Sequence, residues 1–238
     1  MIKNCFANGA KKAVTFSFDD GITQDVRLIA LMDKYGLKGT FNLNSGLMGQ
    51  KDSLDIYGTV VDHSMIPKGE IRQLYKNHEI AGHTLTHPLL TDLTDDEVIY
   101  EIEQDRLKLS EIAGYEVVGF AFPNPWGKIE DFTHLSELCK KTGVKYARTT
   151  YITDGFEYED DLFSIGMTVS ISNIEHTFEL AKKFVDLKTE TPKVFYIMGH
   201  AYEFDYFKSW DKAEELFKFI SNRDDIFYGT NKEIYLLN

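Results

Sequence analysis

Residues 13–21 read AVTFSFDDG. The first six are rich in β-branched and aromatic side chains, which is typical of a buried strand. Two adjacent carboxylates, Asp19 and Asp20, follow the strand, and Gly21 comes directly after them. An Asp-Gly pair is common in turns, so one interpretation is simply a turn. Neighbouring carboxylates also repel each other unless a cation or a proton intervenes, so the same residues favour a metal site or an acid–base site.

Outward from this stretch, short apolar runs alternate with amphipathic segments. Further strands are predicted at 39–43, 79–81, 117–122, 145–148 and 193–198. Helices are predicted at 25–35, 68–77, 94–113, 132–142, 176–187 and 211–221. Thr94, with Glu97 three residues later, has the pattern of a capping box at the start of the longest helix. Two short stretches at 226–227 and 233–237 close the series.

This alternation predicts a parallel α/β architecture. The five prolines and seventeen glycines are scattered, and we find no linker and no internal repeat. We therefore expect one domain over residues 1–238, folded as a distorted (β/α) barrel of about seven strands. In such barrels the chemistry lies where the strands end and the following loops begin.

The composition narrows the class of protein. The formal net charge is −12, and the sequence has no basic run, so we expect no nucleic-acid partner and a small neutral or cationic substrate. No stretch approaches the roughly 20 apolar residues of a membrane span. The first ten residues lack the apolar run of a secretory signal, so we expect a cytoplasmic protein without a membrane partner. Two cysteines, Cys5 and Cys139, cannot form a disulfide framework.

The second candidate motif is GHTLTHP, residues 82–88. A spacing of four places His83 and His87 on one face of a helical turn, which suits a divalent metal, and Pro88 requires that turn to stop. A histidine pair at this spacing is also common on surfaces and at caps. Together with Asp20, however, two imidazoles and one carboxylate leave coordination positions open for water and substrate, as catalytic metal sites do.

Two further stretches end predicted strands. FAFPNPWG, residues 120–127, is a proline-rich loop that either only packs Trp126 or presents a backbone N–H to an oxyanion. FYIMGH, residues 195–200, brings His200 out after an apolar strand and a glycine. A histidine at that position is either structural or a general acid.

The order TFSFDDG, HTLTH, PWG and a late histidine resembles the polysaccharide deacetylase family, the NodB-homology group of carbohydrate esterases. The resemblance spans residues 15–200, and its first two motifs are specific in combination. It implies a distorted (β/α) barrel and a metal-dependent hydrolase that removes an N-acyl group from an amino sugar or oligosaccharide.

The resemblance also implies a role for each matching residue. Asp19 matches the catalytic base, and His200 matches the acid that protonates the leaving amine. Trp126 stands at the place of the family's tyrosine and would offer its backbone N–H to the oxyanion. The metal ligands would be Asp20, His83 and His87, holding one divalent ion, zinc or a similar metal, which polarises the acyl carbonyl and lowers the pKa of the attacking water.

The sequence lacks one positively charged residue of the family pattern. The family has an arginine shortly before the proline-aromatic-glycine loop, where it pairs with the base, and here Phe122, Pro123 and Asn124 stand nearby. Arg148 ends the next predicted strand, so we expect it at the same rim, where its guanidinium can hold Asp19 in two hydrogen bonds. An exposed loop arginine is the alternative.

Three functions remain open at this point. The leading one is deacetylation of an amino sugar; the second is opening of a cyclic amide or ureide, as in an allantoinase-like relative; the third is sugar binding without catalysis. Tyr202, Glu203 and Asp205 either line the pocket or belong to a solvated loop. The remaining histidines lie in polar or helical stretches and are expected at the surface: His63, His78, His134 and His176.

Overall fold

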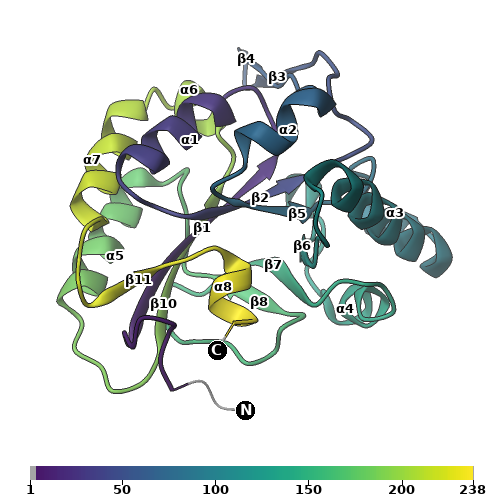
Figure 1. The fold of residues 1–238 in the computed structure, drawn as a ribbon. Coiled ribbons are helices and arrows are strands. Elements are labelled where there is room, and N and C mark those ends of the chain that lie inside the picture. The colour runs from purple at the N-terminus through teal and green to yellow at the C-terminus, as the bar shows by residue number, and fades with distance from the viewer. Residues whose placement is uncertain (1–3, 238) are drawn as a thin grey trace.

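The computed structural model describes residues 4–237, and its centre is a parallel sheet curved into a nearly closed barrel (Figure 1). Neighbouring strands follow the order β8 (Ile165–Met167), β7 (Tyr146–Ile152), β6 (Gly119–Ala121), β5 (Glu79–Gly82), β2 (Gly39–Leu43), β1 (Lys12–Asp20), β10 (Lys193–Gly199) and β9 (Val169–Ser170). A further strand, β11 (Ile226–Tyr228), pairs with the beginning of β1. The predicted single-domain α/β barrel is confirmed, with eight strands around it rather than about seven.

The barrel closes through two very short strands. β8 pairs with β7, and β9, which follows β8 after one residue, pairs with β10. That residue, Thr168, donates its backbone N–H to the carbonyl of Tyr196 on β10 at 2.9 Å. Strands of two or three residues are too short to show a period in the sequence, so neither β8 nor β9 was predicted.

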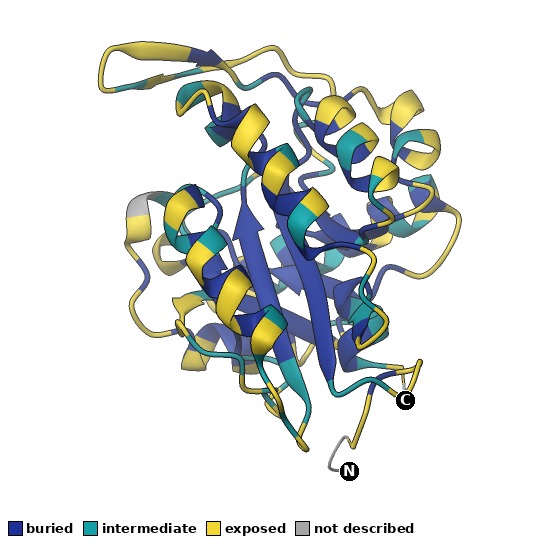
Figure 2. Ribbon diagram, turned by 90° about the vertical axis from the view of Figure 1, so that its left-hand side faces the viewer, coloured by how far each residue is buried: buried dark blue, intermediate teal, exposed yellow. Residues whose placement is uncertain are grey.

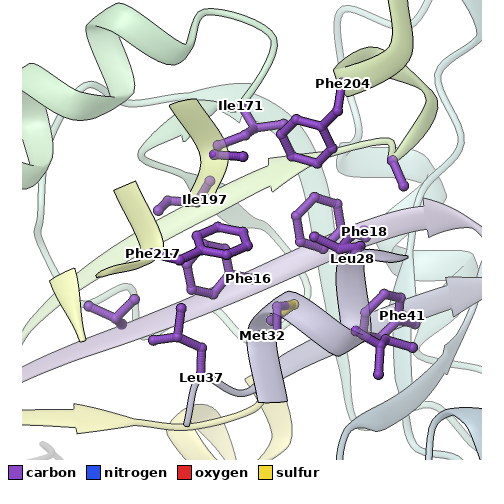
Figure 3. Packing of buried hydrophobic residues seen from close by; sticks show 14 of the residues in the cluster. Phe16, Phe18, Leu28, Met32, Leu37, Phe41, Ile171, Ile197, Phe204 and Phe217 are labelled. Atoms are coloured by element: carbon purple, nitrogen blue, oxygen red, sulfur yellow. The ribbon is translucent and has the colours of Figure 1, made fainter. Parts of the chain in front are cut away.

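Helices cover the outside of the barrel (Figure 1). They are α1 (Asp25–Lys34), α2 (Lys68–Leu74), α3 (Asp95–Ala113), α4 (Thr133–Cys139), α5 (Ile174–Asp186) and α7 (Trp210–Ile220). Figure 3 shows Phe16 and Phe18 of β1 among side chains of the helices, with Phe217 of α7 against Phe16 at a ring-centroid distance of 5.2 Å. Each fully buried phenylalanine contributes about 2–3 kcal/mol to folding, so this outer layer is the main core.

The inside of the barrel is polar near its middle. Along β1, alternate side chains point inward: Thr15 donates to Asn231 at 2.8 Å, and Ser17 accepts from Asn42 at the same distance. Asn231 opens the last helix, α8 (Asn231–Tyr235), which closes the lower end of the barrel. The short stretch predicted at 233–237 therefore begins inside a helix, because Thr230 and Glu233 form a capping box there.

Several connecting elements were not predicted. A hairpin of β3 (Ser53–Ile56) and β4 (Thr59–Asp62) projects from the body, as Figure 2 shows at its upper left. Its two-residue turn places Tyr57 and Gly58 at positive φ, a geometry that sequence normally signals with Asn-Gly. Three short helices complete the set: η1 (Leu90–Asp92), η2 (Pro125–Gly127) and α6 (Tyr202–Tyr206). Within residues 4–237, no helix has both the length and the apolar character of a membrane span.

Candidate active site

The two adjacent aspartates leave β1 in different directions. Asp19 continues the inward alternation of the strand, whereas Asp20 takes a left-handed backbone with φ of 77°. Gly21 follows with φ of 71°, and a Cβ on it would lie 2.6 Å from Leu43 Cδ2. A glycine is therefore required after the pair, and the left-handed Asp20 stores strain of the kind that collects at functional sites.

Asp19 forms a buried ion pair with Arg148, which lies on β7. Nη2 of Arg148 is 2.7 Å from Oδ1 and 2.6 Å from Oδ2 of Asp19, and Asn42 donates a further hydrogen bond to Oδ1 at 2.7 Å. Burial alone would raise the pKa of Asp19, but the charges of Arg148, His83 and His200 outweigh it and lower that pKa. Asp19 is consequently an ionised carboxylate in a fixed orientation.

Asp20 lies among histidines. Its Oδ1 is 3.7 Å from Nε2 of both His83 and His87, and one donor atom from each of the three residues lies within 4.8 Å of the others. Nδ1 of His83 lies 2.8 Å from the carbonyl oxygen of Ala121, which assigns the ring proton to Nδ1 and leaves the Nε2 lone pair free.

The protonation states agree with a metal site. Burial lowers the pKa of His83 to about 4, so the ring is neutral. The pKa of Asp20 is also far below its usual range: burial would raise it, but the hydrogen bond to His63 and the neighbouring histidines outweigh that effect. Imidazole nitrogens and a carboxylate oxygen, as this cluster offers, are ligands that zinc and similar divalent ions take.

The histidine pair does not lie on a helical turn, so that prediction was wrong. Thr84 and His87 both have positive φ, 71° and 55°, and the stretch is an irregular loop. Hydrogen bonds to other segments of the chain fix the conformation of this loop. Asp105 of α3 accepts the backbone N–H of His83 at 2.9 Å, and Asn44 donates to the carbonyl of His83 at 2.6 Å. These tertiary contacts override the local preference for a helix.

His200 follows β10 and faces both aspartates. Its Nε2 lies 4.0 Å from Asp19 Oδ2 and 3.9 Å from Asp20 Oδ2, while Nδ1 lies 3.4 Å from Glu203 Oε1. Burial disfavours the charged ring, but the Glu203 hydrogen bond and the charges of Asp20, Glu203 and Asp19 outweigh it and raise the pKa of His200 to about 10. His200 is therefore protonated at neutral pH.

These residues open into a cavity of about 300 Å³. Trp126 lies in η2 and directly follows Pro125, which lines the cavity. The loop before η2 is fixed by a hydrogen bond in which the Asn124 side chain donates to Thr150 at 2.9 Å. Besides Asp19, Asp20, His83, His87 and His200, the cavity is lined by Leu54, His63, Phe122, Asn124, Pro125, Thr150, Met198 and Tyr202.

Of the histidines expected at the surface, His78 is buried and His63 is partly buried. The ring of His78 is fully covered, and that of His63 is 12% exposed and reaches Asp20, with Nε2 3.0 Å from Oδ2. His63 follows the unpredicted hairpin, and no local pattern in the sequence separates it from an exposed histidine. Of the open residues after His200, Tyr202 lines the cavity and Glu203 contacts His200.

Barrel and site together define an α/β barrel with a candidate metal centre at the carboxyl ends of its strands. The chain belongs to the polysaccharide deacetylase family, whose model matches residues 7–147. It is therefore a hydrolase of the deacetylase class, whose members are generally metal-dependent. No curated protein sequence matches the chain.

Two solved structures share the fold over nearly the whole chain. A proposed polysaccharide deacetylase from Mycobacterium smegmatis is 17% identical over 99% of this chain and 92% of its own, with a TM-score of 0.69. Peptidoglycan deacetylase PdaC from Bacillus subtilis is 18% identical over 95% of this chain and 91% of its own, with a TM-score of 0.53. Deacetylase PplD from Streptococcus pyogenes, 20% identical with a TM-score of 0.49, is matched over 63% of this chain and 61% of its own length.

Proposed function

We propose that the protein is a metal-dependent deacetylase that removes the N-acetyl group of an amino sugar or a short oligosaccharide. The observation that carries the proposal is the juxtaposition of an ionised, arginine-held Asp19 with the Asp20–His83–His87 cluster at the base of one cavity. Sugar binding alone requires neither a fixed base nor a protonated histidine beside it, so this arrangement favours catalysis.

In this proposal Asp20, His83 and His87 would hold one divalent ion, zinc or a similar metal. A metal bound there would supply Lewis acidity for the acyl carbonyl and the attacking water. Asp19 accepts the proton of that water. Arg148 keeps Asp19 ionised and aimed, because the guanidinium holds both carboxylate oxygens.

The later steps fall to His200 and the loop of η2. His200 is protonated and donates its Nε2 proton to the departing nitrogen, while Glu203 on Nδ1 fixes the orientation of the ring. The backbone N–H of Trp126 stabilises the negative charge that develops on the acyl oxygen. In this proposal Asp19 accepts one proton and His200 donates the other, so residues of this chain carry out both proton transfers.

The cavity supports a small substrate. A volume of about 300 Å³ is at the lower end for small-molecule sites, and Leu54, Phe122 and Tyr202 give it apolar walls. An N-acetylated sugar ring or a short oligomer matches this size better than a bundled polymer chain does.

The test measures products from a small panel of amides. We expect acetate from N-acetylated amino-sugar monomers or short oligomers, and neither ammonia nor ring opening from cyclic amides and ureides. His87→Ala should lose bound metal and activity together, whereas Asp19→Asn should lose about 10²–10⁴ in turnover with metal retained. Activity on insoluble polymer alone would refute the small substrate. Stoichiometric metal in His87→Ala would refute the ligand assignment.

A further inference from the structure

The two carboxylate oxygens of Asp20 face different partners. Oδ1 faces His83 and His87, at 3.7 Å from each Nε2, and Oδ2 faces His63, at 3.0 Å from its Nε2. We propose that His63 is a positioning residue of the metal centre, which holds the outer oxygen of Asp20 so that Oδ1 points at the ion. This inference rests on the metal centre of the proposed function.

His63 acts on the carboxylate rather than on the ion. Among the described residues, the donor cluster that can hold one metal contains Asp20, His83 and His87 but not His63. An ionised carboxylate only accepts hydrogen bonds, so Nε2 of His63 carries the proton in this contact. A protonated Nε2 has no lone pair for a metal. It fixes the rotation of the Asp20 carboxylate instead.

The backbone on both sides of His63 is hydrogen-bonded to the segment that follows Asp20. Ile66 donates its N–H to the carbonyl of Gly21 at 2.9 Å, and Thr23 donates to the carbonyl of Ser64 at 2.9 Å. Gln24 donates its side-chain amide to the carbonyl of Asp62 at 2.7 Å. These bonds lie on both sides of His63, so the imidazole approaches Asp20 from a fixed position.

The ring itself is enclosed. Tyr202 packs against it edge-on at a centroid distance of 5.5 Å, and the side chain is 12% exposed. Its second nitrogen, Nδ1, is buried and lies 4.0 Å from Asp52 Oδ2. Outer partners that hold a ligating carboxylate or imidazole are worth about 10–100-fold in metal affinity. The segment after β4 therefore belongs to the metal centre although it supplies no ligand.

The experiment measures Zn²⁺ affinity of metal-free protein by competition with a chromophoric chelator. His63→Ala removes the donor, and His63→Leu removes it while filling the space. His63→Gln places an amide N–H near the position of Nε2. His134→Ala is the matched control, because His134 forms an exposed pair of the same type with Asp95 at 2.8 Å. Urea unfolding of each metal-free variant, measured in parallel, reports the effect on folding.

We expect Zn²⁺ binding about 10–100-fold weaker in both His63→Ala and His63→Leu, recovery of most of it in His63→Gln, and a change below twofold in His134→Ala. Wild-type affinity in His63→Leu would overturn the positioning role and leave the metal centre standing. Equal weakening in Leu and Gln variants would also overturn it. A wild-type protein that binds no Zn²⁺ would instead refute the metal centre and the inference with it.

Discussion

The two adjacent aspartates have different partners in this site. Asp19 ends the inward row of β1 and meets Arg148, whereas the left-handed backbone of Asp20 turns its carboxylate toward His83 and His87. Both remain ionised although they are neighbours, because positive charge and hydrogen-bond donors surround each one. In the proposed mechanism, this difference in partners makes one carboxylate the base and the other a metal ligand.

The arginine predicts a specific kinetic defect. Arg148→Ala should lower kcat at least about 100-fold, because Asp19 loses its orientation, and should leave Zn²⁺ affinity nearly unchanged. Without the guanidinium the pKa of Asp19 rises. Since the base must be deprotonated, the acidic limb of the kcat/KM profile should move to higher pH. The measurement is a pH–rate profile beside a metal titration.

Arg106→Ala is the control for that experiment, because Arg106 pairs with Glu103 at 2.6 Å on α3 and does not line the cavity. Its pH profile should match the wild type. An Arg148→Ala enzyme with an unshifted acidic limb would exclude the pairing from the mechanism.

Part of this site could be predicted from the sequence. Strand ends of a parallel barrel meet at one rim, so the carboxylates at the end of β1 and the histidine after β10 were expected to lie near one another. His63 could not be predicted in this way, since it depends on a hairpin whose Tyr-Gly turn has no usual signature. The catalytic and ligand roles themselves stay predictions.

Among the elements, the main helices and most strands of the barrel were predicted, and the short connecting elements were not. α3 begins where Thr94 and Glu97 predict it, and its capping box is present. The missed elements β8, β9 and α6 are held by tertiary contacts: β8 and β9 by their barrel neighbours, and α6 by β4 and α7. Sequence period carries information only over several residues, so short elements such as β8, β9 and α6 show none, whereas β2 and β5 were found from their apolar runs.

The helix α8 predicts a stability effect at the end of the barrel away from the cavity. The Asn231 side chain accepts from Thr15 and donates to Tyr196 inside the barrel. Asn231→Ala leaves both hydroxyls buried without this partner, so we expect a loss of about 2–4 kcal/mol in the free energy of unfolding. Urea denaturation measures it. Asn77→Ala, which removes an exposed side chain, should change stability by less than about 0.5 kcal/mol.

For the whole molecule, a buried histidine predicts how stability depends on pH. Burial lowers the pKa of His78 to about 4, although Asp33 opposes it, and Nδ1 accepts the N–H of Gly39. The unfolded chain has a histidine pKa near 6.5, so between about pH 4 and 6.5 the unfolded state binds more protons. Stability from this group is therefore full above about pH 6.5 and falls as the pH drops toward 4.

Replacement of the ring isolates that contribution. His78→Asn keeps an acceptor near Nδ1 but does not titrate, so its unfolding free energy should fall less steeply with decreasing pH. The difference in slope should reach about 1.4 kcal/mol per pH unit between pH 4.5 and 6. Equal slopes for the two proteins would contradict a neutral buried His78. His134→Asn, at an exposed position, serves as control.

The pairing of β1 with β10 and β11 has a consequence for synthesis on the ribosome. Lys12 pairs with Lys193 and with Ile226, so the first strand emerges roughly 180 residues before its partner on one side. A nascent chain that already carries β2, β5, β6 and β7 still has one side of β1 without a neighbour, with the phenylalanines of that strand incompletely covered. Such an unpaired strand can associate with other chains. We expect the growing polypeptide to be a substrate for chaperones until β10 has left the exit tunnel, and truncation before residue 193 to yield aggregates rather than a smaller soluble barrel.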